Sequence, residues 1–132
     1  MGIDVALAVQ DGVFGALNVE GVTDLAQVTQ HVLEETDLPL VVIGRIELTP
    51  EGGKGGGLDR ASVEVLTYVR EPRRAALYEL QHAVRTALEG AQLVADGAEL
   101  SPPELVSRDD GLLEDGQTYE GTQIFALYVQ PA

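Results

Sequence analysis

The chain has no cysteine, and only two of its 132 residues are histidines. The absence of cysteine excludes disulfides, thiolate zinc sites, iron–sulfur clusters and cysteine nucleophiles. It leaves the redox compartment open, because a chain without thiols reports nothing about oxidation. His31 and His82 fall on different predicted elements and have no ligand partner at helical spacing. The sequence therefore offers no thiol or histidine chemistry.

Positive charge is scarce as well. Eight Lys and Arg stand against 22 Asp and Glu, which gives a formal net charge of -14 at pH 7. Binding to nucleic-acid phosphates or to an anionic membrane surface needs clustered cations, so the composition argues against both. The longest apolar run, Leu38 to Gly44, is far too short to span a bilayer. We expect no membrane association and no signal peptide, since the first residues carry no positive charge.

Size and composition favour one folded domain. A chain of 132 residues lies in the usual range for a single domain. Its 45% hydrophobic and 23% charged residues are typical of globular proteins and not of disorder. We find no internal repeat and no linker, and we predict one domain over residues 1–132.

The first half of the chain predicts a helix. Apolar residues recur at helical spacing from Val5 to Leu17. Gly12 and Gly15 interrupt this stripe, and each either weakens the helix or permits close packing. The following segment, 18–24, is predicted to be a turn-rich exit.

Three strands are predicted next. Residues 26–33 are rich in β-branched side chains and favour a short strand. Residues 40–49 form a strand whose first half is apolar on both faces. Residues 59–70 alternate, and they pair with 40–49 across the glycine-rich loop 50–57 as a long antiparallel hairpin.

The second half predicts a helix followed by further strands. The helix begins at Glu71-Pro72 and ends at Gly90. Residues 92–105 favour a weak strand pair, 109–121 an acidic loop or hairpin tip, and 122–130 a final strand. The predicted fold is α+β: a single, mostly antiparallel sheet with an N-terminal helix and a central helix packed on it.

The glycine-rich loop contains a lysine among glycines, which invites comparison with phosphate-binding loops. A P-loop needs its Lys-Ser/Thr pair at the entry to a helix, whereas a strand follows here. We predict a flexible hairpin tip, with ordering against a partner as the alternative. The residues concerned are Gly52, Gly53, Lys54, Gly55, Gly56 and Gly57.

Carboxylates are dense near the C-terminus, at Asp109, Asp110, Glu114 and Asp115. Calcium favours such oxygen ligands, but the alternating ligand spacing of an EF-hand is absent. We therefore predict a solvated acidic tip. No serine lies in a nucleophile elbow and no acid–base pair is recognisable. The sequence predicts no enzyme, no metal and no cofactor.

Arg70, Arg73 and Arg74 concentrate three of the eight cations at one strand-to-helix junction. Two interpretations stay open. The arginines pair with local acids such as Glu71, since most surface ion pairs contribute little. Alternatively, they form an interface patch that meets an acidic surface of a neighbouring subunit.

Several segments together resemble a phage family. The strand from Val63 to Arg70 precedes a helix that ends in Ala87-Leu88-Glu89-Gly90. An arginine–aspartate pair, Arg108-Asp109, then precedes the segment Asp115 to Gly121, and the last strand carries Phe125. This pattern is similar to the tail terminator and tail completion proteins of long-tailed phages and gene transfer agents. The chain departs from it at Pro102-Pro103, at the glycine-rich loop and at Glu120, where relatives often carry histidine.

The resemblance implies a structural role. Such proteins are small α+β subunits that form a hexameric ring, cap the tail tube, stop its polymerisation and offer a surface to the head connector. The implied partners are other copies of the chain, the major tail tube protein and the head–tail connector or stopper; the free protein is either a ring or a monomer. DNA passes through without specific binding, which suits an acidic protein. The implied location is the virion tail, with assembly in the host bacterial cytoplasm.

Ring closure is a heterologous contact, so two different patches must match. We predict that one patch is the arginine junction of Arg70, Arg73 and Arg74 and that the other is the acidic segment Asp109–Glu120. The apolar strand with Val41 and Ile43 is expected to be buried against a neighbour. Two alternatives to a terminator remain: a head-completion or neck stopper protein of the same particle, and a small non-enzymatic ligand-binding regulatory domain.

Overall fold

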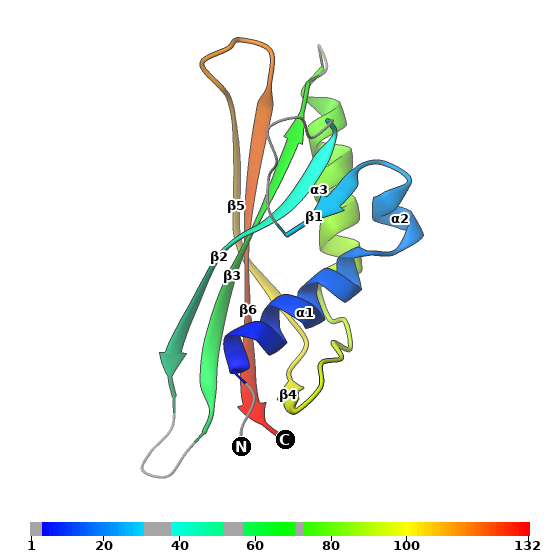
Figure 1. Ribbon diagram of the computed structural model, residues 1–132. Coiled ribbons are helices and arrows are strands. Elements are labelled where there is room, and N and C mark those ends of the chain that lie inside the picture. Colours follow the sequence, from blue (N-terminus) through cyan, green and yellow to red (C-terminus); the bar gives the residue numbers. More distant parts are fainter. Residues whose placement is uncertain (1–3, 31–37, 52–56, 71–72) are drawn as a thin grey trace.

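A computed structural model describes residues 4–30, 38–51, 57–70 and 73–132. Within these ranges the chain forms a six-stranded sheet and three helices (Figure 1). In chain order the elements are α1 (Val5–Leu17), α2 (Glu20–Thr23), β1 (Gln27–Thr29), β2 (Leu40–Pro50), β3 (Asp59–Val69), α3 (Ala75–Leu88), β4 (Ala98–Leu100), β5 (Glu104–Leu112) and β6 (Tyr119–Pro131).

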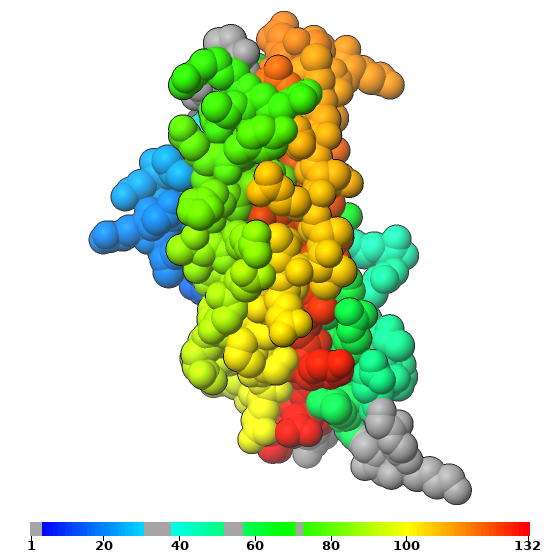
Figure 2. Space-filling view, turned by 180° about the vertical axis from the view of Figure 1, so that it is seen from behind, coloured from blue at the N-terminus to red at the C-terminus, as the bar shows by residue number. Residues whose placement is uncertain are grey.

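The sheet is mixed but mostly antiparallel. Its order is β1-β2-β3-β6-β4, and β5 pairs with β6 on the same side as β4. Only β1 runs parallel to its neighbour, β2. Seen from behind, α3 and β5 lie next to each other, with β6, β3 and β2 following across the sheet (Figure 2). The predicted α+β class is confirmed.

The predicted hairpin of two long strands is confirmed. β2 and β3 pair from Leu40↔Tyr68 to Pro50↔Asp59, with an irregularity between Ile43 and Ile46. Gly57 is exposed beside the hairpin end. The prediction of a flexible tip concerns mainly residues 52–56, which lie outside the described ranges.

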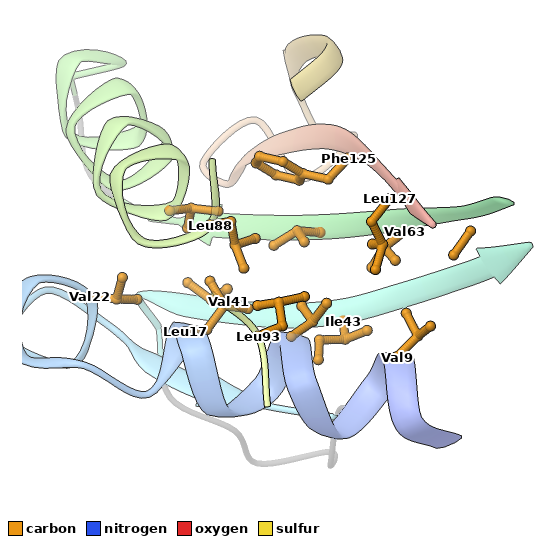
Figure 3. Packing of buried hydrophobic residues seen from close by; sticks show 14 of the residues in the cluster. Val9, Leu17, Val22, Val41, Ile43, Val63, Leu88, Leu93, Phe125 and Leu127 are labelled. Atoms are coloured by element: carbon orange, nitrogen blue, oxygen red, sulfur yellow. The ribbon is translucent and has the colours of Figure 1, made fainter. Parts of the chain in front are cut away.

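The core lies between the helices and one face of the sheet. Alternate residues of β3 are buried, as predicted, and β6 contributes Phe125, Leu127 and Val129 to the same face. Val9 and Leu17 of α1 and Leu88 of α3 pack against this face (Figure 3). Apolar side chains at the period of each element therefore meet in one cluster.

The structure corrects the prediction that Val41 and Ile43 lie at a subunit interface. Their side chains are 0% and 5% exposed within the single chain, and both belong to the core cluster. Leu40 and Val42, on the opposite face of β2, are buried as well. A neighbouring subunit is not needed to explain why this strand is apolar on both faces.

The acidic loop or hairpin tip predicted over residues 109–121 is a hairpin tip, but the prediction made it too long at both ends. β5 continues to Leu112 and pairs with β6 in the register Asp109↔Thr122 and Leu112↔Tyr119. Only the short segment between these strands turns, closed by a hydrogen bond from the Leu113 N–H to the Thr118 carbonyl (2.8 Å). The strand was hidden because nearly all its side chains are exposed or half-buried, so no apolar alternation marks it.

Smaller differences concern helix ends and short elements. α3 begins at Ala75, later than the predicted start at residues 71–72, which lie outside the described ranges. The predicted turn at 18–24 contains the four-residue helix α2. The strand predicted over 26–33 is described only for its first part, Gln27–Thr29.

Candidate subunit interface

Helix α3 covers the outer edge of strand β5 through side-chain contacts to its backbone. The Gln81 amide donates to the Asp109 carbonyl (3.2 Å), and the Leu105 N–H donates to a Glu89 carboxylate oxygen (3.1 Å). The hydrogen bond from the Leu105 N–H has the largest lowering effect on the pKa of Glu89, and the hydrogen bond from the Arg85 side chain lowers this pKa further. Because a sheet edge covered in this way cannot add another strand freely, β5 is closed to edge-to-edge pairing here.

Five side chains next to this edge form what we call the arginine–tyrosine cluster: Arg74, Tyr78, Arg108, Asp110 and Tyr119. The Arg74 guanidinium lies 3.2 Å from an Asp110 oxygen and 5.1 Å from the centre of the Tyr119 ring. The Arg108 guanidinium lies 5.6 Å from the centre of the Tyr78 ring, and the Tyr78 hydroxyl is 3.3 Å from Asp110. Guanidinium groups over aromatic faces gain from the ring quadrupole, so these arginines are held in place.

The turn between β5 and β6 is organised around Asp115. Its carboxylate accepts from the Thr118 hydroxyl (2.6 Å) and from the backbone N–H groups of Thr118 and Gln117 (2.9 Å each). These bonds, together with the charge of Arg70 at 3.9 Å, lower the pKa of Asp115 to about 2. Arg70 also donates to the Thr118 hydroxyl (3.2 Å), which ties the turn to the end of β3.

The structure brings together residues that the sequence placed on two separate patches. Arg74 faces Asp110 and Arg70 faces Asp115 within one chain. The two predicted patches therefore lie side by side on one chain and are joined by two ion pairs. The hypothesis that the arginines of one copy meet the acids of the next stays a prediction. Arg73 is exposed and has no ion pair among the described residues, and the same holds for Glu114.

Glu71, the local acid predicted to pair with these arginines, lies outside the described ranges. Sequence reasoning missed Tyr78 and Arg108. They lie on different elements, and no local pattern links a tyrosine on a helix to an arginine 30 residues further along. The packing of α3 beside β5 places them side by side.

A small buried polar group lies behind this region. Gln81, Gln123 and Thr67 are almost fully buried, and the Gln123 amide donates to the Gln81 carbonyl (3.0 Å). The Thr67 hydroxyl and the Gln123 side-chain oxygen have no hydrogen-bond partner among the described residues. Gly121 lies against this group, and a Cβ placed there would be 2.4 Å from both the Gln81 amide nitrogen and the Thr67 hydroxyl oxygen. The sequence carries no signal for this contact.

Comparison with known families identifies the chain. The family model of the tail completion protein gp17 matches residues 12–130. The chain belongs to this tail completion family. The resemblance seen in the sequence is thereby confirmed, and the family is one of structural proteins of phage tails.

Solved structures agree with this assignment at the level of the fold. A chain in the virion of a native gene transfer agent particle superposes with a TM-score of 0.88 at 20% sequence identity. The match covers 98% of this chain and 99% of the other. Comparison with curated protein sequences gave no match.

An open groove of about 730 Å³ lies where Pro102 and Pro103 separate β4 from β5 and leave part of β6 beside Leu105 and Val106. Its lining mixes apolar side chains with the polar ones of Arg60, Ser101 and Glu104. A smaller hollow of about 110 Å³ lies between α3 and the end of β3, where the ligand-binding alternative expected a pocket.

The described residues show no metal-binding arrangement and no membrane-spanning helix. No three carboxylate or histidine side chains in this part of the chain come together to hold an ion. No helix in the same ranges combines the length and hydropathy needed to cross a bilayer.

Proposed function

We propose that this chain is a tail terminator: copies of it form a ring that caps the tail tube, stops its polymerisation and joins it to the head connector. The observation that carries the proposal is the family match, which spans nearly all of the chain. A protein that completes a tail must bind the end of the tube and present a new surface beyond it. The hexameric ring and the partners, the major tail tube protein and the connector, are parts of this proposal.

Charge and burial are consistent with a structural conduit. The net charge of -14 repels DNA and so allows it to pass without sticking. The matching chain in a gene transfer agent virion has the same extent as this one, which supports a place in the virion tail. No described residue cluster suggests catalysis, and we propose no enzymatic activity.

Deletion of the gene in a particle-producing host tests the proposal. A terminator is needed to stop tube growth, so electron micrographs of the deletion should show overlong tubes and heads without tails. Adding back the protein should restore tubes of uniform length. Tails of normal length that fail to join heads would instead support a neck stopper, and unchanged particles would overturn both assignments.

Purified protein gives a second readout. Native mass spectrometry of the protein alone, and of the protein mixed with tail tubes, should reveal a ring in at least one of the two. A tube preparation that continues to elongate in the presence of the protein would contradict the terminator assignment.

A further inference from the structure

Charge is distributed unevenly along the chain. All eight Lys and Arg residues lie from Arg45 onward, so the first 44 residues carry acids without any cation. In the described part of this region, Asp11, Glu20 and Asp24 form no ion pair. The N-terminal helices therefore present an uncompensated negative surface.

Helix α2 is the most prominent part of this surface. We define the α2 lobe by Val19, Glu20, Asp24 and Leu25, all of which are exposed, while Val22 anchors the helix in the core. Val19 and Leu25 are 43% and 44% exposed and flank the same short helix, so they form one small apolar surface. The N-terminal helices project from one side of the molecule (Figure 2). The lobe thus combines two apolar side chains with two free carboxylates.

A complementary surface exists elsewhere on the same chain. In the arginine–tyrosine cluster, Arg108 has no carboxylate partner among the residues that the structure describes, whereas Arg74 is paired with Asp110. Tyr78, on which Arg108 stacks, is 39% exposed. Arginine and tyrosine dominate the binding energy of many protein interfaces, and a pre-positioned guanidinium suits a carboxylate.

We propose that the α2 lobe of one copy docks on the arginine–tyrosine cluster of the next, with Glu20 or Asp24 meeting Arg108. The two surfaces differ, as a head-to-tail contact requires. They lie on different sides of α3: Leu25 of the lobe lies beside Ala76 and Glu79, whereas Tyr78 reaches Asp110 on β5. In Figure 2 α2 projects at the side of the molecule, whereas α3 and β5 face the viewer. A second copy is therefore needed to bring them together. This inference rests on the proposed ring and names its contact.

Cross-linking tests the contact directly, because the chain has no cysteine and every introduced thiol is unique. Asp24→Cys and Arg108→Cys chains, mixed and treated with a short bis-maleimide, should give abundant dimers that join the two variants. A chain carrying both substitutions should give a ladder of linked copies that ends at the closed ring. Val94→Cys in place of Asp24→Cys is the control, since Val94 is 80% exposed and lies outside the lobe.

Charge exchange supplies an independent readout. Arg108→Asp and Asp24→Arg should each weaken ring formation or tube capping at least about tenfold, because like charges then face each other. The chain with both substitutions should recover assembly. Arg45→Asp makes the same charge change at Arg45, which pairs with Glu47 on β2, and should assemble like the unmodified chain.

The outcomes separate the two proposals. If the unmodified chain caps tubes but the reversals have no effect and the cross-links match the control, the contact is wrong and the terminator assignment stands. If the unmodified chain neither forms rings nor caps tubes, the proposed function fails and the contact falls with it. Circular dichroism of each variant excludes misfolding as the cause of a loss.

Discussion

Replacing Gly121 by alanine should destabilise the fold more than any other single methyl group added to a described glycine of β5 or β6. Gly121 is buried in β6, opposite Thr67 of β3 and Asp110 of β5. The new Cβ would lie 2.4 Å from the Thr67 hydroxyl oxygen and 2.4 Å from the Gln81 amide nitrogen, where real Cβ atoms are not found. Neither neighbour can leave easily, since both are buried.

The loss in the free energy of unfolding follows from two costs and one smaller gain. Overpacking a buried site costs about 1–3 kcal/mol. Displacing Gln81 also breaks its hydrogen bond to the Asp109 carbonyl, which adds about 0.5–1.5 kcal/mol. Alanine recovers about 0.5–1 kcal/mol relative to glycine in a strand. The expected net loss lies between about 0.5 and 4 kcal/mol with a middle value of about 2 kcal/mol, which for a chain of this length corresponds to a fall in Tm of roughly 6–10 °C.

Urea denaturation with a check of the m-value measures this loss. Gly111→Ala is the matched control, because its Cβ meets nothing within 4 Å on the neighbouring strand, and it should stabilise the chain by up to about 1 kcal/mol. In a chain that already carries Thr67→Ala, Gly121→Ala should cost less, since one of the two obstructing atoms is gone. Equal stability of Gly121→Ala and Gly111→Ala would refute the packing argument.

Three further predictions concern the turn, the exposed sheet face and α1. Because the pKa of Asp115 is lowered to about 2, the stabilisation by its carboxylate is complete above its ordinary pKa of 3.8 and is lost as the pH falls towards 2. Asp115→Asn should therefore be less stable than the parent at pH 6. Urea titrations at lower pH should show this difference in stability shrinking. Burial, and then Glu120, raise the pKa of Tyr68 to about 12, so folding should weaken as pH rises from 10 to 12, and Tyr68→Phe should remove the latest tyrosinate absorbance phase. In α1, Gly15→Ala has open space and should stabilise by up to about 1 kcal/mol, whereas Gly12→Ala meets the Leu100 side chain at 2.7 Å and should lower the thermal midpoint.

The parts of the fold that could be predicted are those whose periodicity is enforced by burial. β3 alternates because one face is fully buried, and α3 shows a clear apolar stripe because Leu77, Leu80, Val84 and Leu88 all face the core. The segments that could not be predicted lack such a constraint. β5 is held by pairing with β6 and by capping from α3, so its side chains are free to be polar and its pattern is that of a loop.

Parallel pairing of β1 with β2 could not be predicted for a related reason. Three residues cannot display a periodicity, and nothing in their composition reports the direction of the neighbouring strand. Helix α2, with four residues, is equally short. Elements of this length are decided by tertiary contacts, such as the burial of Val22 in the core, and not by local propensity.

The sequence does not reveal which surface charges pair with one another within the folded chain. Counting neighbours along the chain singles out a group of arginines, but the energetic meaning of a charge depends on which opposite charges the fold places beside it. Arg70 and Arg74 form ion pairs within the chain with acids about 40 residues away. Their charges are therefore less available to a partner than unpaired ones. Arg108 stands in the sequence only as half of an Arg-Asp pair, yet the packing of α3 beside β5 places its guanidinium over the Tyr78 ring. A search for assembly surfaces should therefore start from charges that remain unpaired after folding. Among the described residues Arg73, Arg108 and the acids of the α2 lobe meet that criterion, and of these two arginines only Arg108 stacks on a tyrosine.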